Sequence, residues 1–150
     1  MQIKVKDIAK MIDHSLLSQA LTEKELVEGC EIAKKYNTAS VCVKPYHVAK
    51  ASNELKDSEV LVGAVISFPH GNSTLKIKLA ETEQVLLDGA VEVDIVINLS
   101  KVIEEDWKFL ENEIGSLTSL CHENDAVIKV IFGVDLIEDK HIVELCRICT

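Results

Sequence analysis

The chain has 150 residues, 47% of them hydrophobic, which is enough for one domain with a sizeable core over residues 1–150. Its formal net charge of −9 comes from acidic residues spread along the chain without a basic cluster, a pattern that argues against binding to nucleic acid or to an anionic membrane. No stretch is long and apolar enough to span a bilayer and residues 1–10 lack the features of a signal peptide, so we expect a cytoplasmic protein with a small or medium-sized partner.

Five short apolar runs rich in β-branched residues predict β-strands. The second, third and fifth runs are almost continuously apolar, which is typical of strands covered on both faces. The fourth run differs from them only by its acidic residues. In chain order, the five predicted strands cover residues 12–17, 39–43, 61–67, 91–97 and 127–132.

Longer amphipathic stretches between these runs predict helices. Thr22 with Glu25 three residues later forms a capping-box pattern, which predicts a helix start. Gly89 is a helix stop signal. Apolar residues at three- and four-residue steps from Trp107 onward predict a helix in which Trp107 belongs to the core. The four predicted helices cover residues 22–36, 73–87, 106–121 and 139–150.

The alternation of strands and helices predicts an α/β fold with a parallel sheet. Two architectures meet this description, an open doubly wound sheet and a closed (β/α)₈ TIM barrel. No glycine-rich nucleotide-binding loop is present, which removes the main reason to prefer the open sheet. Because a whole barrel takes about 250 residues, the chain is expected to form about five βα units of a partial TIM barrel.

The five cysteines are an odd number in a chain without a secretion signal, which predicts reduced thiols. Cys146 and Cys149 form a C-x-x-C pattern within the last predicted helix. A redox pair of this kind normally opens a helix after a strand, so we expect these two residues to pack on a helix face instead.

Charged residues inside the predicted strands are the strongest indication of chemistry, because an unpaired buried charge is costly or shifts its pKa until it is neutral. Alternation along the fourth strand places Glu92 and Asp94 on one face, so Asp94 and Lys129 of the next strand can both point inward and form a pair. A purely structural ion pair is the alternative. Asp13, in the first strand, is either a site residue or the anchor of a loop.

Five motifs in fixed order carry a resemblance to a known family. They are IDHSLL at 12–17, SVCVKP at 40–45, FPHGN at 68–72, EVDIVIN at 92–98 and IKVI at 128–131. From these motifs, the chain resembles the N-terminal part of deoxyribose-phosphate aldolases, which are class I, Schiff-base aldolases. The resemblance implies a TIM barrel that reversibly cleaves 2-deoxy-D-ribose 5-phosphate to D-glyceraldehyde 3-phosphate and acetaldehyde in deoxyribonucleotide catabolism, without a metal or another cofactor. The partner would then be a small phosphorylated sugar or aldehyde.

The resemblance also implies roles for single residues. Asp94 matches the catalytic proton donor and acceptor of the family. Lys129 matches a supporting cation that helps keep the reactive lysine unprotonated. Asp13 and Cys42 match residues that line the same pocket, and His70 is a candidate for substrate binding. His14 is interpreted in the same way as His70. The other three histidines show no metal-ligand spacing and are expected to be packed or solvated, namely His47, His122 and His141.

The family's imine-forming lysine lies in a K-T-S-T-G segment on the sixth strand, and no such segment occurs up to Thr150. We therefore expect a barrel without strands six to eight that is inactive alone. Two alternatives stay open: Lys129 forms the imine in a reduced active site, or the chain is a non-catalytic binding or assembly fragment. The first and fifth predicted strands would be unpaired edges, which predicts homo-oligomers or other self-association.

Overall fold

The structure, a computed structural model, describes residues 3–150, so Met1 and Gln2 of the predicted domain lie outside the described residues. Its five strands form one sheet in the order β1-β2-β3-β4-β5. All four neighbouring pairs are parallel. The predicted α/β class and the five predicted strands are thus confirmed. The strands are β1 (Asp13–Leu16), β2 (Ser40–Val43), β3 (Leu61–Ile66), β4 (Glu92–Val96) and β5 (Val127–Ile131).

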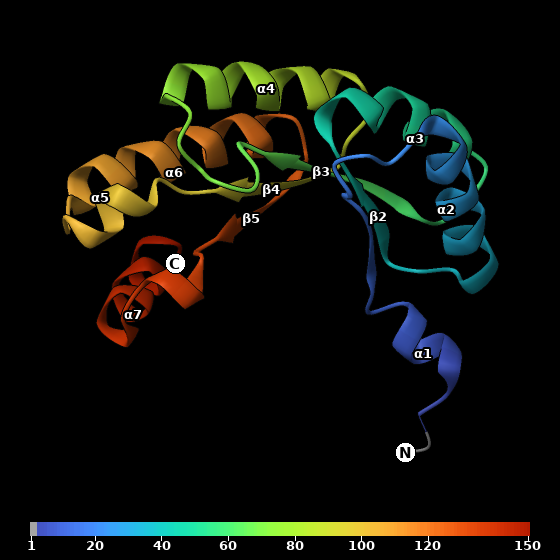
Figure 1. The fold of residues 1–150 in the computed structure, drawn as a ribbon, viewed down its shortest axis with the longest axis horizontal. Helices are drawn as coiled ribbons and strands as arrows, with labels where there is room; N and C mark the ends of the chain where they lie inside the picture. The colour runs from blue at the N-terminus through green and yellow to red at the C-terminus, as the bar shows by residue number, and fades with distance from the viewer. Residues whose placement is uncertain (1–2) are drawn as a thin grey trace.

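Helices cover one side of this sheet. The strands form an arc, and helices α2, α3, α4 and α6 follow its outer side, whereas the inner side faces the open centre of the view (Figure 1). No helix within residues 3–150 meets the length and apolarity needed to cross a membrane. The α-helices are α1 (Val5–Ala9), α2 (Glu23–Tyr36), α3 (Val48–Leu55), α4 (Leu75–Leu87), α5 (Leu99–Ile103), α6 (Trp107–Glu123) and α7 (Asp139–Ile148), with 3₁₀ turns η1 (Pro45–His47) and η2 (Val134–Leu136).

Local sequence signals set the ends of these helices. The Glu25 N–H donates to Thr22 Oγ1 at 3.3 Å and the Thr22 N–H donates to Glu25 Oε2 at 2.8 Å, which confirms the predicted capping box of α2. Beyond α4, Gly89 has a φ of +103°, and a Cβ there would lie 2.5 Å from Ser52 Oγ. The stop after α4 therefore requires glycine.

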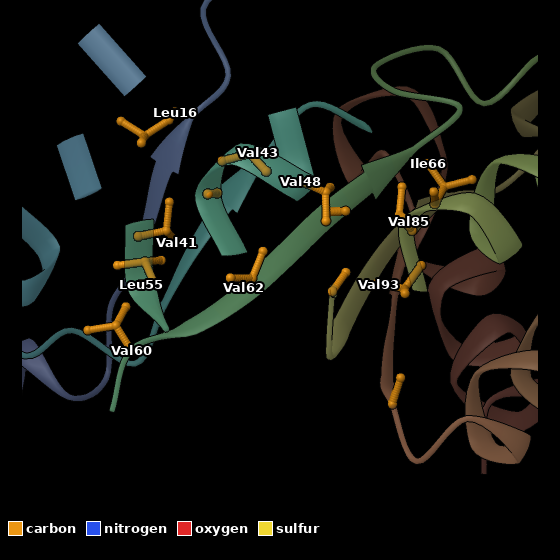
Figure 2. Packing of buried hydrophobic residues seen from close by; sticks show 14 of the residues in the cluster. Leu16, Val41, Val43, Val48, Leu55, Val60, Val62, Ile66, Val85 and Val93 are labelled. Atoms are coloured by element: carbon orange, nitrogen blue, oxygen red, sulfur yellow. The ribbon is translucent and has the colours of Figure 1, made fainter. Parts of the chain in front are cut away.

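The two faces of the sheet differ in chemistry. Paired residues of parallel strands point to the same face, so Val41 and Val62 share the outer face. These residues belong to a buried cluster that packs against the helices, and Figure 2 shows its valines along β2, β3 and β4. A second cluster, against which Trp107 packs as predicted, lies around Leu110 and Leu145. The outer face is therefore the core, whereas the inner face combines apolar residues such as Val65 with charged residues such as Asp94 and Lys129.

The C-x-x-C pattern lies on the solvent side of α7. Cys146 and Cys149 are both exposed, as free thiols. The prediction that they pack on a helix face is wrong, because α7 turns His141 and Leu145, one helical turn apart, toward the protein instead.

Candidate active site

Three carboxylates surround one ammonium on the inner face of the sheet. Lys129 Nζ is the centre, and its partners are Asp13 Oδ2 at 2.7 Å, Asp94 Oδ1 at 3.2 Å and Glu92 Oε2 at 3.3 Å. Asp94 pairs with Lys129 in the register of β4 and β5, which explains why both side chains point the same way. The structure thus brings together the two residues that the sequence placed on one face.

Asp13 joins this group from the opposite edge of the sheet. Its Oδ1 accepts a hydrogen bond of 2.7 Å from Ser40 Oγ, and its Oδ2 accepts one from Lys129. The hydrogen bond from Lys129 lowers the pKa of Asp13, and the bond from Ser40 adds to this effect against the opposing effect of burial. Asp13 is therefore an ionised anchor for the lysine.

Asp94 has a different environment from Asp13. Its side chain is only 16% exposed, and burial raises the pKa of its carboxyl group even though the Lys129 charge acts in the opposite direction. The thiol of Cys42 donates to Asp94 Oδ2 at an Sγ–O distance of 3.6 Å. Burial, together with the charge of Asp94, raises the pKa of Cys42 to about 12, so Cys42 stays a thiol and a donor. A carboxyl group with a raised pKa can hold and release a proton near neutral pH more readily than an exposed one.

Lys129 stays an ammonium in this setting. Burial alone would lower its pKa, but the hydrogen bond to Asp13 and the charges of Asp94 and Glu92 outweigh burial and raise the pKa of Lys129. We call the six residues that these contacts connect the inner-face network: Asp13, Ser40, Cys42, Glu92, Asp94 and Lys129.

Glu92 is one of two members of the network, with Ser40, to which the sequence assigned no role. Its carboxylate accepts from Lys129 at 3.3 Å, and its side chain is 15% exposed. Across the sheet, Gly63 pairs with Glu92, and a Cβ at Gly63 would lie 3.5 Å from the Glu92 side chain. The alternation that placed Glu92 on the face of Asp94 was the signal that could have identified it. Ser40 carries no charge and gave no comparable signal.

His70 lies apart from the inner-face network. It is exposed in the turn that follows β3, and within the described part of the chain no hydrogen bond or ion pair links it to the network. Its neighbours Phe68 and Pro69 instead line a cavity of about 650 Å³ at the carboxyl ends of β1, β2 and β3. Val65, which pairs with Asp94 in the sheet register, also lines this cavity. Val65 is thus the link between this cavity and the strand that carries Asp94, although Asp94 itself does not line the cavity. A role of His70 in substrate binding remains a prediction.

Among residues 3–150, no group of three or more His, Cys, Asp or Glu side chains is arranged to hold a metal ion. The inner-face network itself offers a cation, a thiol and three carboxyl groups. These groups suit proton transfer and the binding of a small polar molecule.

Comparisons with known proteins support the family resemblance that the five sequence motifs indicated. The family model described as DeoC/LacD family aldolase matches residues 8–138. The chain is 44% identical to the deoxyribose-phosphate aldolase of Rhodopirellula baltica, with 96% of this chain and 60% of that protein covered. It is 41% identical to the enzyme of the same name from Treponema denticola, with 95% and 66% covered.

A solved structure shows the same arrangement of elements. The tetrameric deoxyribose phosphate aldolase from Aeropyrum pernix superposes with a TM-score of 0.89 at 31% identity, covering 97% of this chain and 60% of that one. The chain therefore spans less than two thirds of the length of each of these relatives. This coverage confirms the predicted partial TIM barrel.

Proposed function

Because the chain belongs to the DeoC/LacD family of aldolases, we propose that it serves the reversible cleavage of 2-deoxy-D-ribose 5-phosphate to D-glyceraldehyde 3-phosphate and acetaldehyde. The names of its relatives support this reaction. The observation that carries the proposal is the Asp94 carboxyl group of raised pKa, held 3.2 Å from the Lys129 ammonium on the inner face. We also propose that the protein is cytoplasmic and that it acts in deoxyribonucleotide catabolism.

In such a reaction, a lysine amine adds to the substrate carbonyl and forms an imine after loss of water. The protonated imine accepts the electron pair of the carbon–carbon bond that breaks. Protons must move to and from the carbinolamine oxygen and the neighbouring carbon. Asp94 is the group we assign to these transfers, since burial raises its pKa and Cys42 and Lys129 fix its two oxygens.

Lys129 serves as a supporting cation. An ammonium next to a reactive amine lowers the pKa of that amine and keeps it nucleophilic. The alternative, in which Lys129 forms the imine itself, requires an unprotonated Lys129. The three carboxylates around Lys129 and its raised pKa oppose that state.

We further propose that these 150 residues alone do not catalyse the cleavage, because they contain no K-T-S-T-G segment. The test measures aldehyde release from deoxyribose 5-phosphate by the chain alone and after mixing with the remaining part of the Rhodopirellula baltica relative. Activity is expected only after mixing. Cleavage by the chain alone would contradict this proposal and would favour the alternative in which Lys129 forms the imine.

A second candidate function is assembly through the sheet edges. β1 and β5 end the sheet in the described part of the chain, and Val127 at the start of β5 is 55% exposed. An edge strand offers unpaired main-chain groups to another chain. We propose homo-oligomers or other self-association by this route, and a clean monomer in light scattering with cooperative unfolding would count against it.

A further inference from the structure

Lys78 on α4 and Glu113 on α6 form an ion pair of 2.9 Å in which both side chains are 0% exposed. Removing two charges from water is costly, and a buried pair of this kind stabilises a fold little more than well-packed apolar side chains of similar size. Burial lowers the pKa of Lys78, against the opposing effect of the Glu113 carboxylate. Neither residue belongs to the inner-face network. Because apolar side chains would stabilise the fold about as well, stability alone does not explain why the pair is charged.

Each member of the pair binds a main-chain group at the carboxyl end of β4. The Lys78 ammonium donates to the carbonyl oxygen of Val96 at 2.8 Å. The second oxygen of Glu113 accepts from the N–H of Asn98 at 3.0 Å. An ammonium only donates and an ionised carboxylate only accepts, so the two charges match the two main-chain groups. The pair thus provides partners for main-chain groups where the strand ends.

The same short segment is held from other directions. The Ile97 N–H donates to the carbonyl oxygen of Ile131 at 3.4 Å. Gly71 has a φ of +68°, and a Cβ there would collide with the carbonyl oxygen of Ile97, so the loop after β3 packs directly against this segment. Residues 96–98 are therefore enclosed by α4, α6, β5 and the loop after β3.

Asp94 lies two residues before Val96 on the same strand and therefore on the same face. A rotation or shift at the end of β4 would change the distance of 3.2 Å between the Asp94 carboxylate and Lys129. We propose that Lys78 and Glu113 are a positioning pair that fixes the carboxyl end of β4 and thereby holds the Asp94 carboxylate against Lys129. Its importance for catalysis rests on the proposed function, whereas the positioning itself does not.

The test replaces the pair by apolar residues of similar size, K78M together with E113L, in the 150-residue chain. This double change removes both charges without leaving one of them unpaired in the interior. We expect the amide hydrogen of Asn98 to exchange about tenfold faster, because its acceptor is lost. We also expect the pKa of the Asp94 carboxyl, measured by NMR, to rise by about half a unit, because its contact with the Lys129 ammonium, which lowers this pKa, becomes weaker.

The matched control is K50M together with E54Q, which removes an ion pair of 3.2 Å on α3 and should change neither quantity. E113D covers the case in which the apolar double variant does not fold, because it keeps the charge beside Lys78 but shortens the reach toward Asn98. It should show the same two changes in smaller amplitude.

A folded variant with unchanged exchange at Asn98 and an unchanged pKa of Asp94 would overturn the positioning role. Both measurements are made without substrate or turnover. A negative result in these two measurements would therefore count against the positioning role alone, because only the mixing experiment tests the proposed aldolase function.

Discussion

Lys129 on β5 lies 2.7 Å from Asp13 on β1, so one ion pair connects the two outermost strands of the sheet. The two side chains are 37% and 40% exposed, so solvent screens the interaction. The sheet curves as an arc with β1 and β5 at opposite ends of its open inner side (Figure 1), and the two side chains meet across that side.

The variant D13N should therefore cost little stability at neutral pH, about 1 kcal/mol or less. The pKa of Asp13 is lowered in the folded state. Such a group stabilises the fold above its unfolded pKa of about 4, and this contribution disappears as pH falls through the lower folded pKa. Urea unfolding of wild type and D13N should thus differ at pH 7 and converge at acidic pH. A difference that persists at low pH would contradict this role.

E92Q should lower the pKa of Lys129, because one of the three carboxylates that favour the ammonium is neutralised. The expected shift is about half a unit to one unit, measured from the NMR signal of the Lys129 side chain as a function of pH. E83Q, which changes an exposed carboxylate on α4, is the control and should leave this pKa unchanged. An unaltered Lys129 pKa in E92Q would remove Glu92 from the network.

D94N should reduce aldehyde release in the mixed preparation by about 10²- to 10⁴-fold, the usual contribution of a general acid or base. The asparagine keeps the size of the side chain but can neither accept nor release a proton in the required range. Circular dichroism and sedimentation of D94N should match wild type, which separates loss of chemistry from loss of assembly. Retention of full activity would exclude Asp94 as the proton donor and acceptor.

The thiols should react with iodoacetamide in an order set by exposure and charge. Cys146 and Cys149 are exposed, whereas Cys42 is buried and has a pKa of about 12. Because the thiolate is the reactive form, Cys42 should stay unmodified at pH 8 when Cys146 has reacted completely. Peptide mass spectrometry at successive times measures this order. Early alkylation of Cys42 would mean that its thiol is not held as a donor to Asp94.

L117A should destabilise the chain by about 2–5 kcal/mol, because Leu117 on α6 is fully buried in the cluster between the outer face of the sheet and the helices. Leu87, which is 77% exposed at the end of α4, provides the comparison. L87A should change the free energy of unfolding by about 0.5 kcal/mol or less. Denaturant unfolding at one pH measures both. A similar cost for the two variants would contradict the division between core and surface.

The sequence predicted the five strands and the four longer helices because each carries a periodic pattern or a capping signal. The short helices α1, α3 and α5 were not predicted. They have 5, 8 and 5 residues, too few for a clear amphipathic period, and packing determines them. The same limit applies to Cys146 and Cys149, since spacing alone does not show which side of α7 faces the protein.

The site was predictable where a charge interrupts an apolar strand, as at Asp94 and Lys129. It was not predictable where the signal depends on distant contacts. Lys78 and Glu113 lie on helices, where charged residues are normally solvated, and only the packing of α4 against α6 shows that both are buried. His70 belongs to a motif, but the turn after β3 leaves it exposed.

The ion pair between Lys129 and Asp13 joins residues 116 positions apart in the chain. During synthesis from the N-terminus, Asp13 leaves the ribosome long before its partner exists. The charge cluster therefore cannot form on the nascent chain until its fifth strand has been made. Quality control in the cell would consequently meet an open intermediate that lacks the Lys129 ion pairs for most of the time that translation takes.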